Sequence, residues 1–164
     1  DKDNSTWRRP NRRWVDQEIY MPSAVGEAVG RIVVGIDTSG SIGQAEIGQF
    51  LGELISICNH VQPEGIDLVY WDTEVAGHET YQGAELANVV DTTEAKGGGG
   101  TSPECVPHFI KENRLDPECV IFLTDGYIGR QDPNDYEIGK PIMWCIKGNP
   151  SFNESVVGKV VHVE

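Results

Sequence analysis

Three short segments of the chain place oxygen-bearing side chains where a strand or a loop meets a helix. The segments are Asp37-Thr38-Ser39-Gly40-Ser41, Gly97-Gly98-Gly99-Gly100-Thr101 and Thr124-Asp125-Gly126. Their side chains include the carboxylates of Asp37 and Asp125 and, among the hydroxyls, those of Ser39, Ser41 and Thr101, with no nitrogen or sulfur ligand. Mg²⁺ and Mn²⁺ prefer oxygen ligands, whereas zinc and copper sites use mostly nitrogen and sulfur. The combined set therefore suits a hard divalent cation.

Apolar runs precede the first and the third segment. Ile32–Ile36 and Val120–Leu123 have the composition of buried parallel strands. In an open α/β sheet, ligands bind outside the carboxyl ends of strands, at the point where the connections diverge. We therefore expect Asp37 and Asp125, which follow these runs, to lie at one edge of the sheet.

The residues around these carboxylates suit a site as well. Ser39 and Ser41 fall in the turn that begins the next predicted helix, where free backbone N–H groups and the helix dipole favour negative charge. Gly40 permits the tight turn between them, and the glycine run allows a loop to approach closely and present Thr101. Taken singly, each segment is better explained as a helix cap or a turn. Asp72, after the next strand, fits either a turn or a supporting acid.

Strands and helices alternate after Arg31, a pattern that predicts an α/β fold with a doubly wound, mostly parallel central sheet flanked by helices in three Rossmann-like layers. The predicted strands are Arg31–Ile36, Ile66–Trp71, Val120–Leu123, Ile142–Ile146 and Lys159–Val163, with Glu74–Tyr81 as a short edge strand. The predicted helices are Ile42–His60, Ala84–Val90 and a segment from Pro103 to Arg114. Asp132 to Lys140 is too short and polar to predict a clear helix.

Composition limits the classes of partner. The 164 residues suffice for one domain with a proper core, and 26 acidic against 13 basic residues give a net charge of −13. Such a chain repels nucleic acids and anionic membranes, and no apolar run is long enough to span a bilayer. Four scattered cysteines without a CxxC pair predict free, buried thiols and a cytoplasmic location.

Residues 1–30 differ from the rest, because Trp7–Trp14 concentrates basic side chains and tryptophan. Interleaved Arg and Trp side chains can bind nucleic acid. The acidic net charge instead favours an arm or linker that lies across the domain. Because the chain begins at Asp1 without a methionine, we expect it to be part of a longer protein.

The three segments, in this order and strand context, resemble the metal-ion-dependent adhesion site of von Willebrand factor A-like (VWA, or integrin I-type) domains. The resemblance covers residues 31–164. It implies Mg²⁺ or Mn²⁺ held by hydroxyls and by carboxylates that act directly or through water, with Ser39, Ser41 and Thr101 as the hydroxyls and Asp37 and Asp125 as the carboxylates. It also implies an open metal position that accepts an acidic group of a protein partner.

A less specific resemblance concerns Trp7–Arg13, just before the domain. This segment is similar to a bacterial and phage subfamily in which a VWA-like domain forms the carboxyl-terminal part of metallopeptidase-like proteins. The resemblance implies that a peptidase-like region precedes Asp1 and would carry any hydrolytic activity. Related intracellular VWA proteins suggest a MoxR-type AAA+ ATPase as a partner.

A phosphoryl-transfer enzyme is the alternative from another class. Asp37 at a strand end is similar to the aspartyl nucleophile of haloacid-dehalogenase-like phosphatases, and the glycine loop could cradle a phosphate. That phosphatase pattern needs a second Asp at position 39, which is Ser39, and Gly100 precedes Thr101 where a P-loop needs Lys. GxSxG and HExxH motifs are absent as well. The sequence therefore predicts a metal-dependent protein-binding module without catalytic residues.

Overall fold

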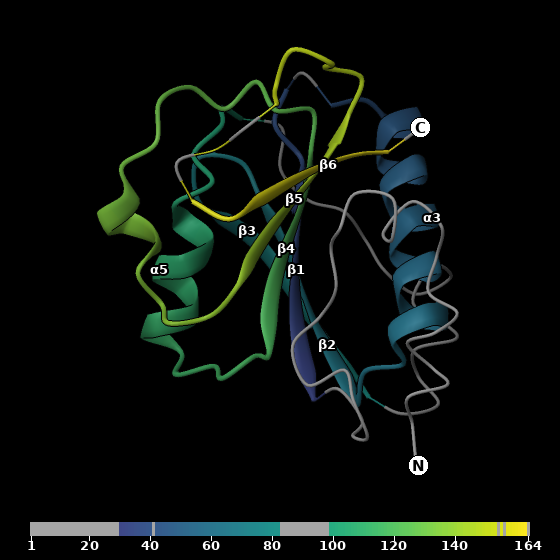
Figure 1. Cartoon of the computed structure of the whole chain (residues 1–164), viewed down its shortest axis with the longest axis vertical. Coiled ribbons are helices and arrows are strands. Elements are labelled where there is room, and N and C mark those ends of the chain that lie inside the picture. Colours follow the sequence, from purple (N-terminus) through teal and green to yellow (C-terminus); the bar gives the residue numbers. More distant parts are fainter. Residues whose placement is uncertain (1–29, 41, 83–98, 154, 156, 164) are drawn as a thin grey trace.

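A computed structural model describes residues 30–40, 42–82, 99–153, 155 and 157–163. Its centre is a six-stranded sheet with the strand order β3-β2-β1-β4-β5-β6 (Figure 1). The strands are β1 (Arg31–Asp37), β2 (Gly65–Trp71), β3 (Val75–Gln82), β4 (Cys119–Thr124), β5 (Ile142–Lys147) and β6 (Lys159–Val163). All neighbours pair in parallel except β2 and the edge strand β3, which are antiparallel. The predicted doubly wound, mostly parallel sheet is confirmed.

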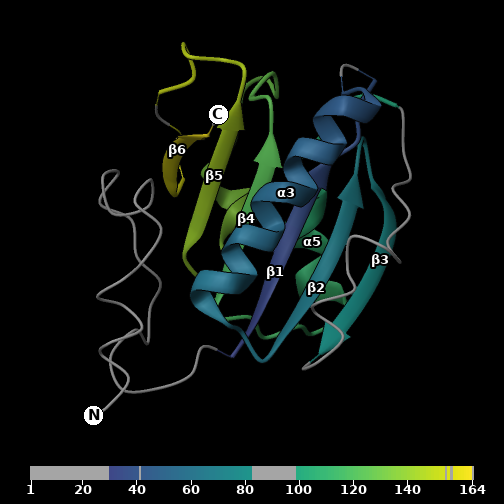
Figure 2. The same cartoon turned by 90° about the vertical axis from the view of Figure 1, so that its right-hand side faces the viewer.

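Helices cover both faces of the sheet. Helix α3 (Gln44–Val61) lies over one face and α5 (Cys105–Glu112) over the other (Figure 2). The α3 side is filled by aliphatic residues of β1 and by helix residues at helical spacing, including Phe50 and Leu54. On the α5 side Trp144 stacks on Phe122, with ring centroids 4.2 Å apart. Each face thus buries its own apolar core, as a three-layer α/β fold requires.

The element bounds differ slightly from the predicted ones. The α3 helix begins at Gln44 rather than Ile42, because Gly43 is extended and its N–H donates to Glu46 Oε1 at 3.0 Å. The α5 helix is shorter than the predicted 103–114 segment, and residues 132–140 contain only the 3-10 helix η2 (Pro133–Tyr136). The helix predicted for Ala84–Val90 lies outside the described residues. None of the described helices is both long and apolar enough to cross a membrane.

The connections diverge between β1 and β4. After β1 the chain moves through α3 to β2, whereas after β4 it moves to β5 on the other side. The adjacent carboxyl ends of β1 and β4 therefore form the switch point of the sheet, at the top of Figure 2. This is the position at which open α/β sheets bind their ligands.

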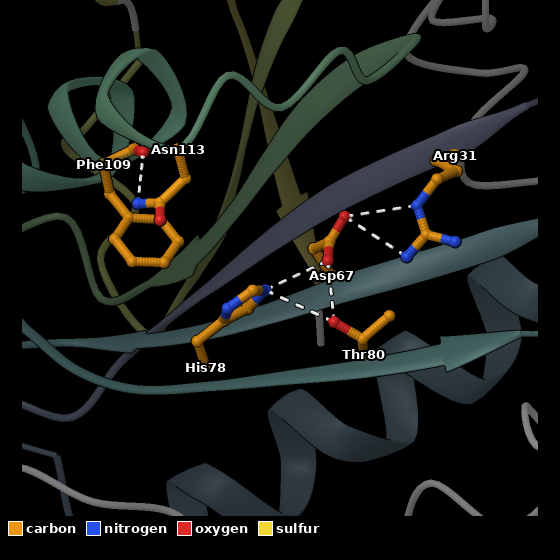
Figure 3. A network of polar contacts seen from close by, with 6 residues as sticks. All are labelled: Arg31, Asp67, His78, Thr80, Phe109 and Asn113. Carbon is orange, nitrogen blue, oxygen red and sulfur yellow. Dashed lines mark hydrogen bonds and ion pairs between the residues drawn. The ribbon is translucent and has the colours of Figure 1, made fainter.

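A buried charge joins the first three strands away from this edge. Asp67 of β2 is 5% exposed. Its Oδ2 lies 3.3 Å from both Nε and Nη2 of Arg31, and its Oδ1 accepts hydrogen bonds from His78 Nε2 and Thr80 Oγ1 at 3.0 Å (Figure 3). The His78 ring also packs edge-on against Phe109 of α5, with centroids 5.0 Å apart. One carboxylate thus links β1, β2 and β3.

Candidate metal centre

Asp37 ends β1 and is completely buried at the switch point. Its Oδ1 accepts a hydrogen bond from the Ser39 N–H at 2.8 Å, and its Oδ2 accepts one from the Thr124 hydroxyl at 2.6 Å. Burial raises the pKa of the Asp37 carboxyl more than these hydrogen bonds lower it, and the nearby Asp125 carboxylate raises it further. The Ser39 N–H and the Thr124 hydroxyl are neutral donors, so neither supplies a compensating positive charge.

The turn after β4 holds the second carboxylate. Thr124 is buried, and its Oγ1 accepts the Gly126 N–H at 3.2 Å. Asp125 is half-buried, and its Oδ1 accepts the Tyr127 N–H at 3.1 Å. Gly126 has φ +80°, and a Cβ there would lie 3.1 Å from both Asn149 Nδ2 and the Phe152 ring. A glycine is therefore needed at this position, and it fixes the turn that carries Asp125.

The glycine-run loop is held against the loops after β1 and β2. The Gly40 N–H donates to the Gly99 carbonyl at 2.8 Å, and the Gly99 N–H donates to Asp72 Oδ2 at 3.1 Å. The Ser102 N–H donates to the Asp72 carbonyl at 2.7 Å. These bonds bracket Thr101, which is half-buried between Gly99 and Ser102. The close approach of backbone that the sequence predicts for this loop is present.

Asp72 holds this loop in place through hydrogen bonds to its backbone. Partial burial raises its pKa, but the hydrogen bonds that its carboxylate accepts from the N–H groups of Glu74 and Gly99 outweigh that effect, so the pKa of Asp72 is lowered. The bond from Glu74 is the turn that the sequence suggests, and the bond from Gly99 is a further role. Asp72 thus supports the segment that presents Thr101.

The structure brings most of the predicted ligands to one edge. The carboxyl ends of β1 and β4 carry Asp37, Ser39 and Asp125, and the loop that is hydrogen-bonded to the β1 end carries Thr101. Ser41 lies outside the described residues. Within the described ranges, no three His, Cys, Asp or Glu side chains are grouped so that they could hold a metal. A metal at this edge would therefore depend on hydroxyl ligands.

The cysteines take no part in this edge. All four are free, and Cys58, Cys119 and Cys145 are buried. Burial raises the pKa of Cys119 to about 12, and the neighbouring Glu118 carboxylate adds to the rise. This thiol therefore stays protonated at neutral pH, which agrees with the predicted packing role.

Thr124 is a positioning residue that the sequence did not single out as a site residue. We expect Thr124→Val to destabilise the protein by about 1–3 kcal/mol, because the substitution leaves a buried Asp37 oxygen and the Gly126 N–H without their partner. Denaturant unfolding measures this change. Thr124→Ser keeps the hydroxyl and should remain within about 1 kcal/mol of wild type. No loss in Thr124→Val together with a clear loss in Thr124→Ser would mean that the methyl packing, and not the hydrogen bond, matters.

Comparisons with known proteins agree with this architecture. A doubly wound α/β sheet with hydroxyls and carboxylates at its switch point is what the resemblance to VWA-like domains implies. Residues 32–164 match the family model described as VWA-like domain (DUF2201), and the chain belongs to this family. It is also similar to an uncharacterized protein of Thermotoga maritima, with 33% identity over 119 residues. The match covers 73% of this chain but 28% of that protein, so the chain spans only part of the relative's length.

Proposed function

We propose that this domain is a divalent-metal-dependent protein-binding module. The observation that carries the proposal is the Asp37 carboxylate, which is fully buried beside Asp125 and forms no ion pair with a Lys, Arg or His of the described part of the chain. An uncompensated buried carboxylate is costly, and a bound cation would offset that cost. Burial of a charge in this way is expected where a protein keeps a site for a cation.

The donor set fits Mg²⁺ or Mn²⁺. The residues that would hold it are Asp37, Ser39, Ser41, Thr101 and Asp125. Their two carboxylates balance a dication, and their hydroxyls are neutral oxygen ligands. When bound, the metal would supply an electrophilic position for a partner's carboxylate. The chain itself holds its ligands through the Thr124 and Asp72 hydrogen bonds, so the loops are arranged before a partner arrives.

Binding is favoured over phosphoryl transfer. A nucleophilic aspartate must reach the phosphorus atom, but Asp37 is 0% exposed and each of its oxygens already accepts a hydrogen bond. The same hydrogen bonds suit a carboxylate that fixes the loops of a metal site after β1 and β4. Phosphatase activity that disappears in Asp37→Asn would instead support the alternative.

We place the domain in a larger, metallopeptidase-like protein that works with a MoxR-type AAA+ ATPase. Two things support the larger protein: the resemblance of Trp7–Arg13 to that subfamily, and the greater length of the Thermotoga maritima relative. The ATPase partner rests on the resemblance to related intracellular VWA proteins. Any peptidase activity would then belong to another region. Copurification of the full-length protein with a candidate ATPase tests the partnership.

Titration calorimetry tests the metal. We expect Mg²⁺ or Mn²⁺ to bind wild type at millimolar concentration or below, and Thr101→Ala and Asp125→Asn to weaken binding at least about tenfold, because each removes an oxygen ligand or a charge. Glu112→Gln removes an equally charged, exposed carboxylate at the far end of α5 and serves as the matched control. Absence of binding to wild type, or equal binding by Asp125→Asn and the control, would refute the proposal.

A further inference from the structure

Side chains from the connection after β5 pack against the turn that carries Asp125. A Cβ at Gly126 would lie 3.1 Å from Asn149 Nδ2 and 3.1 Å from the Phe152 ring, so both side chains approach the backbone of this turn closely. Asn149 is 5% exposed, and Phe152 is half-buried against the α5-side core. Strands β4 and β5 pair in parallel, so the connections that follow them leave from the same edge of the sheet (Figure 2). The Asp125 turn is therefore covered by side chains on its β5 side.

Both of these side chains are themselves held in place. Asn149 Oδ1 accepts the Ser151 hydroxyl at 2.8 Å, and the Asn149 carbonyl accepts the Phe152 N–H at 3.2 Å. The Phe152 ring lies tilted against the Trp144 ring, with centroids 6.4 Å apart. Trp144 is completely buried, and its Nε1 donates to the Val157 carbonyl at 2.8 Å. Asn149 and Phe152 therefore rest on a well-anchored part of the α5-side core.

The strand order makes this contact important for Asp125. Strand β4 lies between β1 and β5, so β1, which ends at Asp37, and the connection after β5 flank the Asp125 turn from opposite sides. Burial raises the pKa of Asp37, and the Asp125 carboxylate raises it further, because the two negative charges repel each other. A turn that yielded to this repulsion would move away from β1 and toward β5. Asn149 and Phe152 occupy the space on that side.

We infer that Asn149 and Phe152 are positioning residues of the candidate metal centre, which keep the Asp125 carboxylate close enough to Asp37 for both to act on one cation. Neither would be a ligand. The inference rests on the proposed function and adds the part of the chain that sets the metal affinity. Residues that hold metal ligands in orientation typically contribute a factor of about 10–100 to metal affinity. By linkage, a bound metal in turn stabilises the arrangement that favours its binding.

Calorimetry with Mg²⁺ and Mn²⁺ on variants of the full chain tests this role. We expect Phe152→Ala and Asn149→Ala each to weaken metal binding at least about tenfold, because the Asp125 turn can then move toward β5. Phe152→Leu still fills the space beside the turn and should keep most of the affinity. Phe109→Ala is the matched control, since Phe109 is also a half-buried ring packed against the α5-side core but contacts His78 instead. This control should bind metal like wild type.

Hydrogen exchange in wild type gives a second measurement that needs no substitution. The Phe152 amide donates to the Asn149 carbonyl, so its exchange reports on the arrangement of this connection. Saturating metal should slow the exchange of this amide, as linkage requires. The Asn113 amide, which donates to the Phe109 carbonyl at 3.0 Å at the end of α5, is the matched control and should exchange at the same rate with and without metal.

The outcomes separate this inference from the proposed function. If wild type binds neither metal, the proposed function fails and this inference fails with it. If wild type binds metal but Phe152→Ala binds it as tightly as Phe109→Ala, the inference alone is overturned. Thermal unfolding in EDTA shows which variants are folded. Where a variant does not fold, wild-type exchange decides: a Phe152 amide slowed by metal supports the inference, and an unchanged one overturns it.

Discussion

Asp37→Asn is expected to stabilise the metal-free protein while it abolishes metal binding. Asn has nearly the size of Asp, and its Oδ1 can still accept the Ser39 N–H. Its Nδ2 can donate to Thr124 Oγ1, which replaces the hydrogen bond that Thr124 now donates. The substitution thus removes a fully buried charge without opening a cavity. We expect a gain of about 1 kcal/mol, or about 2–4 °C in melting temperature for a domain of this size.

Thermal unfolding in EDTA and in Mg²⁺ measures both parts of this prediction. Wild type should gain about 2.7 kcal/mol when free Mg²⁺ is 100 times the dissociation constant, and Asp37→Asn should gain nothing. Because burial raises the pKa of Asp37, ionisation opposes folding once the pH exceeds the ordinary carboxyl value of 3.8. The advantage of Asn in EDTA should therefore be present at neutral pH and fade in acid.

Glu112→Gln again serves as the control, since it removes an exposed carboxylate at the far end of α5 and should leave the response to Mg²⁺ unchanged. If Asp37→Asn melts below wild type in EDTA, the buried charge does not destabilise the metal-free protein. The argument that a bound cation offsets its cost would then fail. An equal Mg²⁺ response of wild type and Asp37→Asn would place any metal elsewhere. Either result can be obtained from one series of melting curves.

Most of the strands could be predicted because they are short, largely apolar runs with turn residues around them. Ile142–Ile146 shows this well, since the observed β5 (Ile142–Lys147) differs from it by one residue. The antiparallel direction of β3 could have been predicted as well, because the short connection of Asp72 to Glu74 allows only an antiparallel pair, whereas a parallel pair needs a crossover of about a dozen residues. The doubly wound topology followed from the alternation of strands and helices.

The candidate site was predictable in part for a similar reason. Asp37 and Asp125 could be placed because each follows a strand end, where local sequence determines position. The role of Thr124 depends on β1 and β4 lying side by side, a long-range contact between residues 87 positions apart. The sequence shows only that a Thr stands directly before Asp125. That position indicates the end of a strand and does not indicate a hydrogen bond to Asp37. The metal itself stays a prediction.

The ion-pair network of Asp67 could not be predicted from the strand pattern. It stands inside an otherwise apolar run, Gly65–Trp71, where burial of a charge has no local explanation. Its partners Arg31, His78 and Thr80 come from two other strands and meet it only in the folded sheet (Figure 3). Sequence spacing therefore could not reveal the network.

Asp67→Ala is expected to destabilise the domain by about 3 kcal/mol. Removing one partner of a buried ion pair costs about 3–5 kcal/mol, because the remaining charge loses its compensation. The lower end applies here, since the side chains of Arg31 and His78 are 32% and 31% exposed and can regain water. A loss of this size corresponds to a drop of about 6–12 °C in melting temperature.

A double-mutant cycle separates the network from the volume that Ala removes. Asp67→Ala should cost much more than Asp67→Asn, which keeps an oxygen for the Thr80 hydroxyl. In the background of His78→Ala, which has already lost one hydrogen bond to Asp67, the Asp67→Ala loss should shrink by about 1 kcal/mol or more. Full additivity would show that the contact of His78 with Asp67 contributes nothing, and that His78 stabilises β3 only through its packing on Phe109. Coupling between the two sites would instead establish that this one carboxylate holds the antiparallel edge strand to the parallel sheet.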